Sequence, residues 1–283
     1  MDPLALTLVL TSAGLHAAWN LLAKRVLGGA SMTWAYALIG TLALTPAGVW
    51  VLRSNVEGLP AWTVPFVLGS AVLHAGYMVS LQRAYAAGDL SVIYPLARGS
   101  GPVLATAVAV VALGERPEPM ALLGTALVAV SAFALVSGGR VRPGRRAVLL
   151  GLATGGFIAA YSVWDATAVA RIGVAPILFA WWSEALRAAL LTPWAWRGRA
   201  QLAREVRARP LSVLGVGVLS PAAYLLVLYA FRLAPVSLVA PAREVSILLT
   251  VVAGAGLLHE GQWVRRLSAA AGMAAGVALL ALH

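Results

Sequence analysis

The chain has 283 residues, of which 61% are hydrophobic and only 11% charged, and it contains no cysteine. Soluble domains carry about 25% charged residues, so this composition excludes an ordinary water-soluble enzyme and a disordered chain. The lack of cysteine excludes disulfides and thiolate metal sites. The net charge of +11 lies almost wholly between apolar runs, where lipid headgroups and membrane orientation account for it without any nucleic acid.

Apolar runs follow one another along the whole chain, each near the roughly 20 residues that a membrane-spanning helix needs. Glycine and proline residues that favour turns separate them. We therefore predict an all-α integral membrane protein in which the connections 138–146 and 197–210 are too short to form a separate domain. The ten predicted transmembrane helices are 4–22, 31–52, 62–83, 91–113, 119–137, 147–168, 175–196, 211–231, 237–258 and 264–282.

The two halves of the chain resemble each other at a shift of about 145 residues. Trp19-Asn20 aligns with Trp164-Asp165, and residues 91–98 align with 237–243 after one gap. The conserved order of these matches favours a duplication, with a first repeat at 1–137, a basic linker loop at 138–146 and a second repeat at 147–283. Because five spans is an odd number, the repeats are inverted in the membrane, as in alternating-access transporters with a midplane binding site.

Five charged residues lie inside the predicted spans, namely Arg98, Glu184, Arg187, Arg243 and Glu244. Each costs roughly 2.5–3.5 kcal/mol at the centre of a spanning helix, so we expect them to face one another or a water-filled cavity. Arg98 and Arg243 occupy matching positions, and we interpret them as a clamp for a carboxylate or phosphate group. Structural bridges from these arginines to Glu184 and Glu244 are the alternative interpretation.

The two glutamates have further possible roles. Glu184 and Arg187 have the i,i+3 spacing of an ion pair on one helix face. If they do not pair in this way, Glu184 or Glu244 is the candidate to bind a coupling proton or a substrate ammonium group.

Uncharged polar and aromatic side chains complete the predicted substrate-binding set. They share a helix face with a charged residue, occupy equivalent positions in the two halves or, in the case of His74, lie at mid-depth in a predicted span. Structural roles as hydrogen-bonded histidines or interfacial aromatics are the alternative interpretation. We expect Asp165 to lie near the end of its span, within reach of water, and give it less weight. The predicted set is His16, Trp19, Asn20, His74, Tyr94, Tyr161 and Trp164.

A Gly-Glu or His-Glu pair ends the fourth span of each half, at Gly114-Glu115 and His259-Glu260, and a glycine-containing last span follows each pair. With the five-plus-five organisation, these features make the chain similar to EamA-type permeases of the drug/metabolite transporter superfamily. The resemblance implies a multi-pass protein of the bacterial inner membrane. In plastid phosphate translocators of this superfamily, basic residues on the fourth and ninth helices hold the phosphate, and Arg98 and Arg243 resemble them by helix and depth.

Orientation stays open at this point. Thirteen basic residues on one side of the predicted topology against four on the other place both termini outside the cell. The family resemblance implies cytoplasmic termini instead. In both predicted orientations the two chain ends lie on the same side of the membrane.

The sequence therefore predicts a secondary transporter of a small anionic or zwitterionic metabolite, such as an amino acid, an organic acid, or a phosphorylated or phosphonate compound. Efflux of organic cations is the alternative, and an intramembrane enzyme or an accessory scaffold is more distant. No phosphate-binding loop, HExxH or GxSxG motif is present, so we expect no catalytic residue, cofactor or metal. The expected partners are a small-molecule solute and the lipid bilayer, with a coupling proton and the choice between monomer and homodimer left open.

Overall fold

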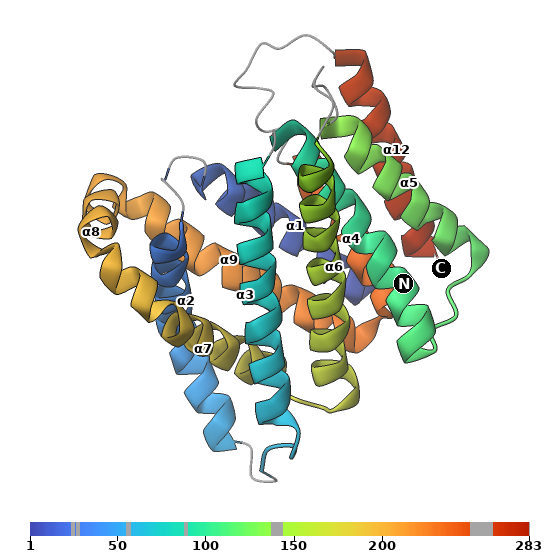
Figure 1. The fold of residues 1–283 in the computed structure, drawn as a ribbon. Helices are drawn as coiled ribbons and strands as arrows, with labels where there is room; N and C mark the ends of the chain where they lie inside the picture. The colour runs from blue at the N-terminus through green and yellow to red at the C-terminus, as the bar shows by residue number, and fades with distance from the viewer. Residues whose placement is uncertain are drawn as a thin grey trace.

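The computed structural model describes residues 1–23, 26, 29–54, 58–87, 90–136, 144–249 and 263–282. These residues form helices joined by short connections, with no strand among them (Figure 1). Most of the predicted linker loop, residues 138–143, lies outside the described residues. The helices are α1 Pro3–Ala23, α2 Ala30–Ser54, α3 Thr63–Ala87, α4 Leu90–Leu113, α5 Pro119–Val136, α6 Arg145–Ala166, the π-helical turn η1 Thr167–Arg171, α7 Pro176–Arg197, α8 Arg199–Ala208, α9 Pro210–Leu233, α10 Val236–Ala242 and α12 Trp263–Leu282.

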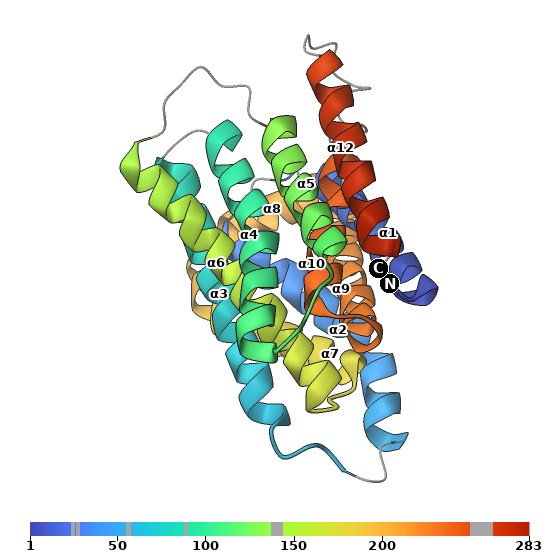
Figure 2. The ribbon, with the colours of Figure 1, turned by 90° about the vertical axis from the view of Figure 1, so that its right-hand side faces the viewer.

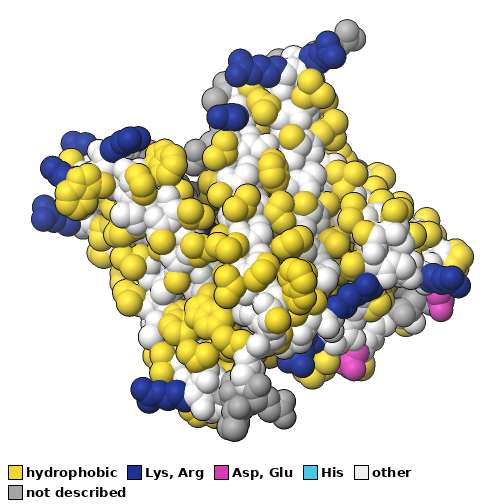
Figure 3. Space-filling model, turned by 60° about the horizontal axis from the view of Figure 1, so that its bottom comes forward, with side chains coloured by type: hydrophobic (Ala, Val, Ile, Leu, Met, Phe, Trp, Pro, Cys, Tyr) yellow, Lys and Arg dark blue, Asp and Glu magenta, His cyan; other side chains and the backbone are white. Residues whose placement is uncertain are grey.

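The outer surface of this helical protein is strongly apolar. Large side chains such as Val111, Leu211 and Trp50 are 70–85% exposed, and Figure 3 shows hydrophobic side chains across one face with arginine at its rims. Six helices in the described part of the chain are long and apolar enough to cross a membrane. Together these features confirm the predicted all-α membrane protein, since an aqueous surface does not tolerate apolar area on this scale.

Two segments differ from the sequence-based prediction. The connection 197–210 contains the short helix α8, whose exposed side is basic and whose Leu202 and Val206 pack against buried residues of α2 and α9. The predicted span 237–258 is not one continuous helix, because α10 ends at Ala242 and a turn follows. Residues 250–258 of that span lie outside the described residues.

The break after α10 places two charged residues in a turn within the membrane region. The amide of Glu244 donates a hydrogen bond to the carbonyl of Pro241 at 3.0 Å, and the amide of Ser246 donates one to the carbonyl of Arg243 at 3.1 Å. These i to i−3 bonds replace the normal i to i−4 pattern of an α-helix at this point, as in a 3₁₀ turn. The turn lets neighbouring residues Arg243 and Glu244 point in different directions.

The start of α10 is fixed from the other half of the chain. Both carboxylate oxygens of Glu115 accept hydrogen bonds at 2.9 Å, from the amides of Val236 and Ser237. A helix start leaves its first amides without partners in the helix, so this carboxylate caps α10. Glu115 thus has a structural role at the end of a span, while its predicted counterpart Glu260 lies outside the described residues.

Helices from the two halves pack against each other throughout the molecule. The main pairs across the halves are α1 with α9, α2 with α7, α3 with α6, α4 with α6, and α5 with α12. The α5–α12 contact is close, because a Cβ atom on Gly124 would lie 2.7 Å from the carbonyl oxygen of Gly276, and one on Gly276 would lie 2.8 Å from that of Gly124. Such small residues let the two backbones touch.

The two ends of the chain meet on one side of the molecule, as both orientations considered from the sequence require. The Met1 amino group donates a hydrogen bond of 3.0 Å to the carbonyl of Ala281 near the end of α12 (Figure 2).

Candidate functional site

A cavity of about 480 Å³ lies between α1, α2, α3, α4, α6, α7, α9 and the turn that follows α10. This volume is within the range of sites for small molecules. It brings together most of the side chains singled out from the sequence, although they come from distant parts of the chain. The predicted residues that line it are His16, Trp19, Asn20, His74, Arg98, Tyr161, Glu184, Arg187 and Arg243.

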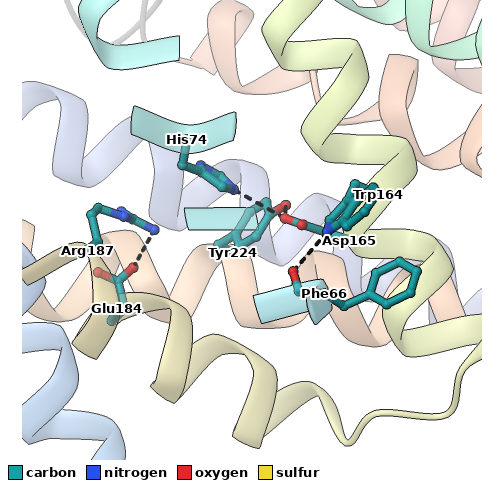
Figure 4. Close-up of polar contacts among 7 residues, drawn as sticks. All are labelled: Phe66, His74, Trp164, Asp165, Glu184, Arg187 and Tyr224. Carbon is teal, nitrogen blue, oxygen red and sulfur yellow. Dashed lines mark hydrogen bonds and ion pairs between the residues drawn. The ribbon is translucent and has the colours of Figure 1, made fainter. Parts of the chain in front are cut away.

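Three residues of the predicted set are not among those that line the cavity. Glu244 is 3% exposed and contacts the lining residue Arg98 from behind the wall. Trp164 lies away from the cavity, on the outer side between α3 and α6, where its indole nitrogen donates to the Phe66 carbonyl at 2.8 Å (Figure 4). Tyr94 belongs to α4, but its side chain is outside the described part of the chain.

Arg98 is held in a buried ion pair that links the two halves. Its Nε lies 3.1 Å from Oε2 of Glu244, and its Nη2 donates to the Ser246 hydroxyl at 3.3 Å. Arg98 and Glu244 are only 8% and 3% exposed. The pair matches the structural alternative drawn from the sequence for one arginine, and it neutralises the positive charge of Arg98 at the cavity wall.

Glu184 and Arg187 form a second pair on α7. Nη2 of Arg187 lies 3.2 Å from Oε1 of Glu184 (Figure 4), as their i,i+3 spacing predicted. The side chain of Arg187 is 22% exposed, so this pair reaches the cavity water while its carboxylate end is buried.

Arg243 differs from the other two arginines of the cavity. Within the described residues it makes no ion pair, and its Cζ lies 5.5 Å from the centre of the Tyr224 ring. A guanidinium over an aromatic face is held in place by the ring quadrupole, yet keeps its charge and donors available. The two arginines that the sequence suggested as equal arms of a clamp are therefore electrostatically unequal.

Asp165 lies behind the cavity wall, against the lining residues His74 and Tyr224, which corrects the expectation that it reaches water. It is fully buried, because η1 continues α6 to Arg171 and leaves Asp165 well inside the helical segment. Its Oδ2 lies 3.2 Å from Nε2 of His74 and accepts a hydrogen bond from the Tyr224 hydroxyl (Figure 4). Oδ1 of Asp165 has no hydrogen-bond partner among the described residues.

Aromatic rings form much of the remaining wall. The ring of His74 stacks on Tyr161 at 4.2 Å between centroids, and Tyr224 meets His74 edge-on at 5.4 Å. On α1, the ring centroids of His16 and Trp19 lie 4.6 Å apart, and the buried indole nitrogen of Trp19 has no hydrogen-bond partner in the part of the chain that the structure describes. Such a wall presents π faces to a bound solute.

Tyr224 is the main cavity residue that the sequence reasoning missed. It lies inside an apolar run and carries no formal charge, although Tyr77, 147 residues earlier, also lines the cavity. A signal was available nonetheless, because Ser220 and Tyr224 have the i,i+4 spacing of one helix face, and both line the cavity.

Comparison with known proteins gives a consistent result. Residues 145–282 match the model of the EamA-like transporter family. Among 29 matching chains of solved structures, one that is described only as a crystal structure of a protein has a TM-score of 0.80 and 17% sequence identity, and the match covers 98% of this chain and 96% of that one. At this identity the likeness shows the fold alone. No curated protein matches the chain.

Proposed function

Because this chain belongs to the EamA-like transporter family through residues 145–282, we propose that it is a secondary transporter of small anionic or zwitterionic metabolites. The family makes it a membrane transporter rather than an enzyme. The substrate class and the mechanism are our proposal, argued from the charges and rings of the cavity.

Arg243 is the observation that carries the proposed substrate class. Charged side chains in membrane helices are rare and normally paired, yet this guanidinium faces the cavity with no ion pair among the described residues. A carboxylate, phosphate or phosphonate group of a solute would give this guanidinium a direct anionic partner and accept two parallel hydrogen bonds from it. Arg243 is therefore proposed as the residue that binds the anionic group.

The remaining candidate residues are proposed to shape the rest of the site. His16, Trp19, Asn20, His74 and Tyr161 would contact the uncharged part of the solute. In a zwitterion, the ammonium group would lie against the aromatic faces.

The ion pairs disfavour the cation-efflux alternative. The carboxylates of Glu184 and Glu244 each lie within 3.2 Å of an arginine nitrogen. Neither glutamate is left to bind an organic cation without first giving up its partner, and a buried arginine deprived of its carboxylate is strongly unfavourable.

The packing supports ten spans arranged as two inverted repeats, with the first at 1–137 and the second at 147–283. If each helix of the first half is exchanged with its counterpart in the second, the α1–α9 contact becomes the α6–α3 contact, while α2–α7 and α5–α12 map onto themselves. A twofold axis in the membrane plane produces this pattern. We propose that rocking of the two repeats about the cavity opens it to each side in turn.

Uptake into proteoliposomes tests the proposed substrate class. The purified protein is reconstituted and supplied with labelled pyruvate or gluconate as monoanions, succinate, inorganic phosphate, L-alanine as a zwitterion, and choline as a cation. We expect saturable uptake of at least one anion or zwitterion, with choline at the level of protein-free liposomes. Uptake of choline alone, or of none of these compounds, contradicts the proposal.

A further inference from the structure

A titratable side chain, His74, faces the cavity beside the proposed anion site. Its Nε2 lies 3.2 Å from Oδ2 of Asp165, which also accepts a hydrogen bond from the Tyr224 hydroxyl. Because a carboxylate only accepts, Nε2 of His74 is the nitrogen that carries the hydrogen. Nδ1 of His74 makes no hydrogen bond to any residue in the described ranges, so it is the atom left to take a proton from the cavity.

His74 is connected to the anion site through one tyrosine. The hydroxyl of Tyr224 donates to Asp165, and the face of the same ring lies under Arg243 at 5.5 Å. The histidine ring itself meets Tyr224 edge-on at 5.4 Å. A charge bound at Arg243 therefore acts on His74 over a short distance in a region of low dielectric constant.

Every element packed around His74 contributes a titratable or charged group. The groups are Tyr161 and Asp165 from α6, Glu184 and Arg187 from α7, Tyr224 from α9, Arg243 from the turn after α10, and, across the cavity, His16 from α1 and Arg98 from α4. Counted with Asp165 and Glu244 behind the wall, the described residues of the cavity and its wall hold three arginines and three carboxylates. If the histidines are neutral, the net charge of these side chains in the empty site is therefore zero.

This balance predicts what happens when a solute binds. A monoanion at Arg243 leaves the site with one uncompensated negative charge, which is unfavourable inside a membrane protein. One proton added to Nδ1 of His74 restores neutrality and converts the His74–Asp165 contact into a full ion pair. A zwitterion adds no net charge, so it creates no demand for a proton.

We propose that His74, held by Asp165 and Tyr224, is the proton-binding site of this transporter, and that it takes up one proton with each monoanion and none with a zwitterion. This inference rests on the proposed function. By linkage, the bound proton and the bound anion stabilise each other, so an inward proton gradient drives monoanion uptake.

The glutamates that the sequence suggested for this role are less suitable. Glu184 and Glu244 each neutralise an arginine at 3.2 and 3.1 Å. Protonating either of them would release a buried guanidinium as an uncompensated charge. Protonating His74 instead completes an existing contact with Asp165.

The test measures the ratio of protons to solute in proteoliposomes that contain a trapped pH-sensitive dye. Labelled pyruvate, gluconate and L-alanine are supplied separately, and solute uptake and internal acidification are recorded together. In the wild type we expect about one proton per monoanion and none with L-alanine. In His74→Gln the ratio for monoanions falls to near zero while downhill uptake continues, and Asp165→Asn is a second variant with the same expected loss.

His16→Gln is the matched control, because His16 is the other histidine among the residues described as lining the cavity. Whatever its effect on the rate, His16→Gln is expected to keep the wild-type proton-to-solute ratio. Monoanion uptake without protons in the wild type, proton movement retained in both His74→Gln and Asp165→Asn, or uptake of L-alanine alone overturns this inference and leaves the proposed function standing. Uptake of no anion or zwitterion contradicts the proposed function itself.

Discussion

Arg243→Gln is expected to reduce uptake of the transported anion by roughly thirtyfold or more, because losing one partner of a desolvated charged contact costs about 2–5 kcal/mol. Folding should be less affected than by the loss of an ion-paired charge, since Arg243 makes no ion pair within the described residues. Arg243→Lys keeps the charge but loses the planar two-donor geometry, so an intermediate loss is expected. Initial rates of uptake across a concentration series measure all of these effects.

The matched control for this experiment is Arg53→Gln. Arg53 lies exposed at the end of α2, remote from the cavity lining. The Arg53→Gln substitution removes the same charge and the same kind of side chain, but from the protein surface, so uptake should remain at the wild-type level. Equal losses in Arg53→Gln and Arg243→Gln would indicate a general effect of charge removal and would contradict a binding role for Arg243.

Glu244→Gln is expected to cause the largest loss of stability among single substitutions in the cavity wall. Arg98 is 8% exposed and its ion pair with Glu244 measures 3.1 Å, so the substitution leaves a buried guanidinium without its carboxylate. Breaking a buried pair in this way costs about 3–5 kcal/mol. The midpoint of thermal unfolding in detergent micelles should fall clearly below that of the wild type.

A double substitution distinguishes the effect of breaking the ion pair from the effect of altered side-chain packing at this position. Arg98→Met combined with Glu244→Leu removes both charges and fills similar space, and it should recover most of the lost stability. Glu184→Gln provides the comparison, because its partner Arg187 is 22% exposed and retains access to cavity water. Wild-type stability of Glu244→Gln would show that Arg98 is solvated and would contradict the buried pair.

Much of this site was predictable because charge in a membrane helix is so unfavourable. Arg98, Arg243 and Glu184 interrupt apolar runs, and the cost of exposing them to lipid predicts that they turn inward whatever the details of packing. The i,i+3 spacing of Glu184 and Arg187 likewise predicted their pairing, since neighbours on one helix face do not depend on the tertiary structure.

The contacts between distant helices could not be predicted in the same way. Which of two arginines pairs with Glu244 depends on the turn after α10, where Arg243 and Glu244 diverge. The depth of Asp165 depends on η1, which extends α6 beyond its apolar run. Tyr224 became part of the site only because α9 packs beside α1 and α6 and turns that ring toward His74.

The placement of Trp164 shows the limit of reasoning from the repeat. Trp19 and Trp164 align in the two halves, yet Trp19 lines the cavity and Trp164 packs on Phe66 at 4.6 Å between ring centroids. Aligned residues of an inverted repeat occupy the same place on their own helices. The helices themselves meet different neighbours wherever the sequences of the two halves differ.

The most direct test of the central claim is an experimental structure of the protein with the best-transported anion of the panel bound. The account predicts that the anionic group lies in the cavity, about 2.7–2.9 Å from the guanidinium nitrogens of Arg243, with the Tyr224 ring beneath that arginine. An anion bound elsewhere, with Arg243 turned toward lipid and the cavity empty, would contradict it.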